Sequence, residues 1–227
     1  MNFIVYSELW VLGCSLVGVI FAVIGLLKHY RIMYLRMVCW AVICAFFARL
    51  FHVFVIVFFK SYDFNINMGT MGVFGSLLFL LSANYGQING LVDDGSRRAK
   101  KARLIALIAP LIIIAMYLYA FYMWGGFENV MIELYSHINL AIVAIVIMPC
   151  IYFNFKHLII YDVEGGIVKS LRPYNALAVI YELMVMAEWI TMRTAEFDLF
   201  VVTMVVQGIV LLLLVPVAGR GVKKWMI

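Results

Sequence analysis

An arginine and a histidine stand three residues apart inside one long apolar stretch, Met37–Phe59. Residues at this spacing share one face of an α-helix, so Arg49 and His52 are expected to point in the same direction. An arginine within the hydrocarbon of a bilayer costs roughly 2.5–3.5 kcal/mol even on insertion-based scales. Its guanidinium therefore needs a carboxylate, a polar protein group or water beside it. These residue types indicate an intramembrane site for an anion or an ion pair.

Other apolar stretches carry polar residues at a similar depth, and these are candidate partners for Arg49. The carboxylate partner is expected to be Glu188 or Glu182, and a small polar ligand or ion is expected to bind beside the pair. The alternative is a fixed ion pair that only holds two helices together. The predicted ligand-binding residues are Arg49, His52, Glu182, Glu188, Gln207 and His137.

A second set of polar residues lies toward the opposite ends of the same stretches. It comprises Asn84, Tyr85, Gln87, Asn154, Asn175 and Tyr181. These side chains form either an inner gate for transport or hydrogen bonds between helices that have no further role. Asn84 and Gln87 are the predicted inner-gate residues.

The elements that hold these residues follow from composition and from the lengths of the apolar runs. The chain is 67% hydrophobic and 13% charged, against about 45–50% and about 25% in soluble domains. A soluble fold of this length lacks the interior to bury so much apolar surface. Seven runs have the length that a bilayer requires of a helix. They cover residues 9–27, 37–59, 69–92, 104–124, 138–155, 174–192 and 199–218. We therefore expect an all-α integral membrane protein, a seven-transmembrane-helix bundle that forms a single domain over residues 1–227.

The basic residues predict how the helices are oriented. Every lysine and arginine except Arg49, Lys60 and Arg193 falls in the segments after the first, third, fifth and seventh runs. Because cytoplasmic loops of membrane proteins are rich in lysine and arginine, we expect the N-terminus outside and the C-terminus in the cytoplasm. The chain is then a multi-pass protein of the cell membrane. Topology also accounts for the net charge of +5, so no nucleic-acid partner is expected.

Small residues at four-residue spacing indicate where helices approach closely. The first run contains Cys14, Gly18 and Ala22 in this pattern, and the third contains Gly86 and Gly90. Because small side chains allow close contact between helix backbones, the first and third helices are expected in the interior of the bundle.

Several kinds of chemistry lack the residues that they need. No lysine lies in the middle of the seventh run, which excludes a retinal pigment. The histidines do not form pairs at the depths that two bound haems require. No HExxH, GxSxG or P-loop sequence occurs, and no cysteine pair suits a metal or a disulfide framework. We therefore expect no enzyme activity, no metal and no cofactor.

The leading functional prediction is a membrane receptor or sensor module. A small polar ligand would bind in an outward-facing pocket around Arg49, and the signal would pass to a separate cytoplasmic or membrane partner. The first alternative is a small-solute transporter or channel that uses the same site together with Asn84, Gln87 and Glu182. The second alternative is a structural subunit of a membrane complex.

Overall fold

The structure is a computed structural model that describes residues 2–28, 32–60, 66–87, 95–126, 134–161, 166–194 and 196–224. Every regular element within these ranges is a helix, which confirms the all-α prediction. The helices are α1 (Asn2–Lys28), α2 (Met33–Phe59), α3 (Met68–Gln87), α5 (Arg97–Ala106), α6 (Ile108–Met123), α7 (Leu134–Ile159), α8 (Ile167–Thr194) and α9 (Phe197–Lys223).

Seven helical spans within the described residues are long and apolar enough to cross a membrane, with α5 and α6 together forming one of them. Most of the predicted runs are contained in these helices, but the helices continue beyond them. For example, α8 begins at Ile167, whereas the apolar run begins at Tyr174. Helical hydrogen bonding continues because an isolated backbone N–H or C=O near the bilayer is costly. Residues 88–92 of the third predicted helix lie outside the described residues. The orientation of the chain and its location in the cell membrane stay predictions.

The fourth span is interrupted at Leu107, between α5 and α6. The Leu107 amide donates to the carbonyl of Leu104 at 3.2 Å, which is a tighter turn than the α-helical pattern. Three residues later comes Pro110, which has no N–H to donate to the carbonyl of Ala106 and whose ring crowds that turn. The proline therefore explains why the helix breaks one turn before it.

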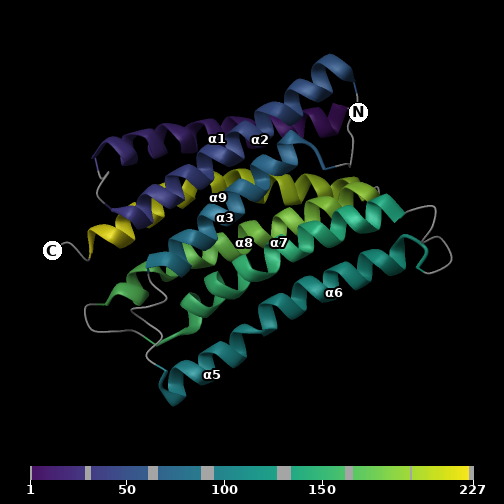
Figure 1. Cartoon of the computed structure of the whole chain (residues 1–227). Helices are drawn as coiled ribbons and strands as arrows, with labels where there is room; N and C mark the ends of the chain where they lie inside the picture. Colours follow the sequence, from purple (N-terminus) through teal and green to yellow (C-terminus); the bar gives the residue numbers. More distant parts are fainter. Residues whose placement is uncertain are drawn as a thin grey trace.

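Six of the seven spans form a closed ring. In ring order, α1 packs against α2, α2 against α3, α3 against α7, α7 against α8, α8 against α9, and α9 against α1. The chain thus contributes two sets of three helices, α1–α3 and α7–α9, which meet where α1 contacts α9 and where α3 contacts α7. The α6 helix lies outside the ring, beside α7 and α8, at the lower edge of Figure 1.

The prediction that the first helix lies in the interior is wrong. Much of α1 is exposed, and its main contacts are with α2 and α9 at one edge of the bundle (Figure 1). Its small residues nevertheless serve close packing, because a Cβ atom on Gly18 would lie 2.8 Å from the carbonyl oxygen of Leu211. The spacing therefore identified a packed face on a helix that is otherwise turned outward.

The third helix packs closely against α2 along a glycine face. A Cβ atom on Gly72 would lie 2.9 Å from the Cβ atom of Ala48 and 3.1 Å from its Cα atom. Half of the most apolar part of α3 is buried, against 22% for α1. The glycines thus allow α3 to approach the part of α2 that carries Arg49.

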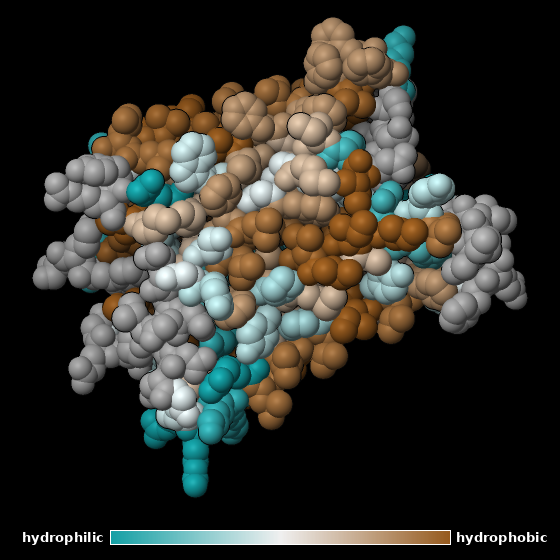
Figure 2. All heavy atoms as spheres, viewed as in Figure 1, coloured by the Kyte–Doolittle hydropathy of each residue, from teal (hydrophilic) through white to brown (hydrophobic). Residues whose placement is uncertain are grey.

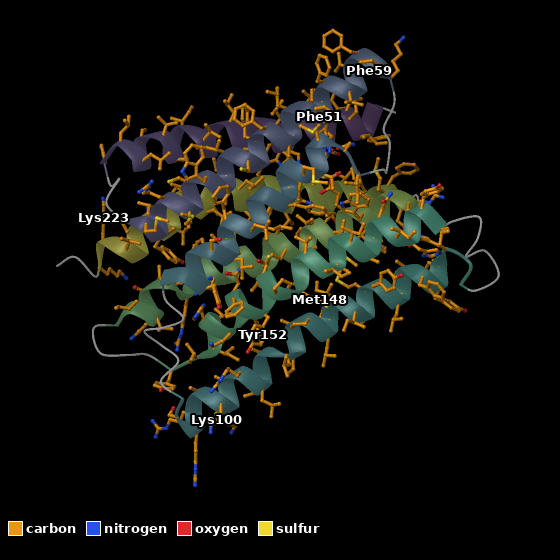
Figure 3. The ribbon with its side chains drawn as sticks, in the orientation of Figure 1. Phe51, Phe59, Lys100, Met148, Tyr152 and Lys223 are labelled. Atoms are coloured by element: carbon orange, nitrogen blue, oxygen red, sulfur yellow. The ribbon has the colours of Figure 1, made fainter. Side chains whose placement is uncertain are left out.

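The sides of the bundle are mostly apolar, and one end carries exposed basic residues. Hydrophobic residues cover most of the face seen in Figure 2, and hydrophilic ones gather at the lower left, over α5. In Figure 3, Lys100 of α5 and Lys223 of α9 lie toward one end of the bundle, and Phe59 of α2 lies at the other. This distribution suits a molecule with lipid around its sides and basic groups near one membrane surface.

Candidate functional site

Arg49 is the centre of a buried ion-pair network. Its Nη1 atom donates to Glu188 Oε1 at 2.7 Å, and its Nη2 atom donates to Glu188 Oε2 at 2.6 Å. This two-pronged contact between guanidinium and carboxylate is the strong form of the pair. Nη1 also lies 3.2 and 3.3 Å from the two carboxylate oxygens of Glu8. One cation on α2 therefore holds carboxylates from α8 and α1. We call Glu8, Arg49, His52, Glu188 and Gln207 the Arg49 cluster.

Gln207 of α9 completes the network and has a defined orientation within it. Its Oε1 atom accepts from Arg49 Nη2 at 2.6 Å, while its Nε2 atom donates to Glu188 Oε2 at 2.7 Å. The same nitrogen donates to the carbonyl of Met184 at 3.1 Å. Both ends of the amide are engaged, so Gln207 fixes the Arg49–Glu188 pair in place and joins α9 to it.

His52 lies at the margin of the cluster, where a glycine makes room for it. Its Nδ1 atom is 3.7 Å from Glu8 Oε1, and its side chain is 14% exposed. A Cβ atom on Gly69 of α3 would lie 2.3 Å from the imidazole ring, so any larger residue there would displace His52.

Apart from the partly exposed His52, the cluster is buried in the protein. Arg49 is 1% exposed, and Glu8 and Gln207 are 0% exposed. The cavity beside Glu8, which Val5, Val53, Ile56 and Val57 also line, leaves no room for a water molecule. A ligand that binds Arg49 directly must therefore displace Glu8, Glu188 or Gln207. The outward-facing pocket stays a prediction.

A second polar cluster joins three helices, α3, α7 and α8. Asn84 of α3 donates through Nδ2 to Asn175 Oδ1 of α8 at 2.9 Å, and also to Asn154 Oδ1 of α7. Asn154 in turn donates through Nδ2 to Glu182 Oε1 of α8. None of the four residues is more than 1% exposed. We call Asn84, Asn154, Asn175 and Glu182 the Glu182 cluster.

The hydrogen bonding of the Glu182 cluster is incomplete. Glu182 Oε2, Asn84 Oδ1 and Asn175 Nδ2 are buried and have no hydrogen-bond partner among the described residues. Cys150 and Tyr174 are the ionisable side chains near the carboxyl group. No lysine, arginine or histidine of the described chain pairs with it. Glu182 is thus a buried carboxyl group without a cationic partner among the residues that the structure describes.

The two clusters separate residues that the sequence grouped together. Glu188 pairs with Arg49, whereas Glu182 belongs to the second cluster with the predicted gate residue Asn84. His137 lies apart from both, with its ring centroid 5.0 Å from that of Phe121 and 5.3 Å from that of Trp124. Tyr85 is 59% exposed. The side chain of Gln87 lies outside the described residues.

Glu8 is the member of the Arg49 cluster that sequence reasoning missed. It stands directly before the apolar run 9–27 and so lies outside the predicted helix. In the structure α1 begins at Asn2, and Glu8 is buried one and a half turns inside it. An acidic residue at the edge of an apolar run, with an arginine buried in the next run, was the available signal.

Both clusters bridge the two sets of three helices. The Arg49 cluster takes Glu8 and Arg49 from α1 and α2, and Glu188 and Gln207 from α8 and α9. The Glu182 cluster takes Asn84 from α3, and its other members from α7 and α8. Tyr181 of α8 is buried close to Ser76 of α3, has Arg49 and Glu188 as charged neighbours, and directly precedes Glu182 in the chain. Polar groups therefore line the interface between the sets, inside an apolar bundle.

Comparisons with protein-family models, with curated proteins and with solved structures found no match to this chain.

Proposed function

We propose that the chain is a membrane transporter for a small polar or charged solute. One observation carries the proposal: two buried polar clusters lie one after the other along the interface between two three-helix sets. Polar and ionisable groups inside a membrane are costly and mark solute or ion pathways. Binding sites between two helical sets that move against each other are the usual basis of alternating access.

In this proposal the Arg49 cluster is a closed gate. Its ion pairs hold α1 and α2 to α8 and α9, and the two sets separate there only when these contacts break. An anionic or polar solute that approaches Arg49 replaces Glu8 or Glu188 and so removes the contact that keeps the gate shut. The solute then reaches Tyr181 and the Glu182 cluster, from which it leaves when the other end opens.

The receptor or sensor function is the second candidate, because the same Arg49 pairs are a contact that a ligand can break. A ligand that opened only the Arg49 end would change the packing of α1 and α9 without crossing the bundle. The separate partner protein that such a sensor requires stays a prediction.

Accessibility of Ser76 separates these functions without knowledge of the solute. Ser76 is 0% exposed and lies near Tyr181. Along α3 it stands between Gly72, which packs against Ala48 next to Arg49, and Asn84 of the Glu182 cluster. The variant Ser76→Cys is made after the four native cysteines are changed to alanine, and it is placed in sealed liposomes. Charged thiol reagents that cannot cross the bilayer are then added on each side separately.

A transporter predicts labelling of the Ser76→Cys thiol from both sides, because the bundle opens alternately to each. A sensor predicts labelling from one side only. A permanently closed structural subunit predicts no labelling from either side, and that result contradicts the transport proposal. Unfolding the labelled liposome sample in detergent provides the control, since every introduced thiol must react there.

A further inference from the structure

The charge of an ionised Glu182 carboxylate would not be balanced by any cationic group of the described residues. It is 0% exposed, and a lone ionised carboxylate in a low-dielectric interior is strongly unfavourable. Asn154 of α7 donates a hydrogen bond to it, and Cys150 of α7 and Tyr174 of its own helix are its ionisable neighbours. Asn84 of α3 and Asn175 of α8 are joined to it through Asn154. Lys156 and His157 follow Asn154 on α7, but neither pairs with Glu182. Neutrality therefore requires one positive charge that the described residues do not supply.

The oxygens of the cluster are suitable ligands for such a charge. Glu182 Oε2 and Asn84 Oδ1 are buried without a donor, and the amide oxygens of Asn154 and Asn175 lie in the same hydrogen-bonded chain. Carboxylate and amide oxygens suit hard cations. One carboxylate balances a single positive charge, and no group of three His, Cys, Asp or Glu gathers among the described residues. A monovalent cation therefore fits this donor set better than a divalent one.

We propose that Glu182, Asn84, Asn154 and Asn175 form an intramembrane site for a monovalent cation, either Na⁺ or H⁺. Binding of the cation at Glu182 and release on the other side would couple solute movement to a cation gradient. This coupling rests on the proposed transport function, but the binding site itself does not.

The test measures cation binding on purified protein in lipid nanodiscs. Binding of ²²Na⁺ is measured at equilibrium, and released protons are followed with a pH dye in weak buffer. The wild type is expected to bind about one Na⁺ per chain and to release a proton as it does so. Glu182→Gln is expected to lose both signals. The matched control is Glu196→Gln, which changes an exposed carboxyl group at the start of α9 and should retain both.

Two outcomes distinguish the possible occupants, and a third overturns the site. If only H⁺ binds, ²²Na⁺ shows no saturable binding, but titration of the wild type takes up about one proton more than Glu182→Gln between pH 5 and pH 9. If the wild type and Glu182→Gln are indistinguishable in both Na⁺ binding and proton uptake, Glu182 is a permanently neutral structural group and the inference is wrong.

A second variant guards against failure of Glu182→Gln to fold. Asn84→Ala retains the carboxyl group and removes one oxygen ligand, so it should weaken Na⁺ binding at least tenfold, or shift the pH of proton uptake. Failure of transport is distinguishable from failure of the site. If the protein binds the cation but the Ser76→Cys thiol is labelled from neither side, only the transport proposal is contradicted. If the thiol is labelled from both sides but no cation binds, only the cation site is contradicted.

Discussion

At the residue scale, the environment of Arg49 explains how a guanidinium can lie inside an apolar bundle. Two carboxylates and an amide oxygen surround it, so the charge is taken up by protein and not by lipid. Such a buried network adds little stability over an apolar replacement, but breaking it on one side is costly, because charges are left without a partner. The network thus has a large effect on which helices stay together.

Replacement of Arg49 alone tests whether removing one partner of the buried network is costly. Arg49→Leu leaves Glu8 and Glu188 buried together, so we expect a loss of about 3–5 kcal/mol of stability. Thermal unfolding can be followed with a thiol-reactive dye, because Cys39 and Cys150 are buried in the folded protein. Arg193→Leu, at an exposed arginine, is the control and should shift the midpoint little.

The triple variant Arg49→Leu, Glu8→Gln, Glu188→Gln removes the unpaired charges as well. We expect it to recover most of the lost stability, since only neutral side chains remain. If it is no more stable than Arg49→Leu alone, repulsion between the buried carboxylates is not the cause of the loss.

Sequence reasoning identified the polar residues but not all of their partners. Arg49 needed a carboxylate, and α8 carries two candidates, Glu182 and Glu188. They are six residues apart and therefore lie on different faces of the helix. Only the relative rotation of α2 and α8 decides between them, and that rotation depends on packing across the ring. Local sequence does not contain this information, whereas the need for a partner follows from burial alone.

At the element scale, glycines determine how closely α3 approaches α2. Gly72 faces the backbone of Ala48, one residue before Arg49, so the distance between these helices also positions the cluster. The four-residue spacing of small residues predicted the packed face of α1, but on α3 it pointed to Gly86, which has nothing within 4 Å, and not to Gly72. It did not predict that α1 lies at the edge, because a packed stripe on one face says nothing about the opposite face.

Two glycines of α3 provide a matched test of this packing. Gly72→Ala puts a methyl group 2.9 Å from Ala48 Cβ, so we expect a loss of about 1–3 kcal/mol from overpacking. Gly86→Ala adds a methyl group with nothing within 4 Å, and it should leave the protein unchanged or slightly more stable, because alanine favours the helix. Equal unfolding midpoints for both variants would contradict the close approach of α2 and α3.

At the scale of the whole molecule, the ring of six helices divides into the sets α1–α3 and α7–α9. The lengths and apolar character of the spans were predictable, since a bilayer imposes them on the sequence. The order of helices around the ring was not predictable, because it depends on contacts between residues far apart in the chain. The native cysteines allow the division to be tested directly.

A disulfide between the sets α1–α3 and α7–α9 should stop their movement against each other. A disulfide within one set should not. A Cβ atom on Gly208 of α9 would lie 3.3 Å from Cys14 Sγ of α1, and one on Gly75 of α3 would lie 3.7 Å from Cys44 Cβ of α2. The Cβ–Cβ separation at Gly75 is within the range of a disulfide. At Gly208 the Cys14 sulfur is close enough to be bridged, although Trp10, whose Nε1 atom would lie 2.6 Å from the new Cβ atom, must shift. Oxidised Gly208→Cys should abolish labelling at Ser76→Cys from one or both sides, with recovery on reduction, in a background that retains Cys14. In the Gly75→Cys control, with Cys44 retained, labelling from both sides should persist after oxidation.

In the proposed transport cycle, the spacing of Glu182 and Glu188 along α8 would make charge movement between them sensitive to membrane voltage. Six residues of helix separate them, which corresponds to about 9 Å, or about a third of a hydrocarbon layer that is about 30 Å thick. A charge that moves between the two levels crosses that share of the electric field. At about 2.3 kcal/mol per charge for each 100 mV across the full membrane, the step is worth about 0.7 kcal/mol. The potential of an energised cell would then favour one direction of charge movement about threefold.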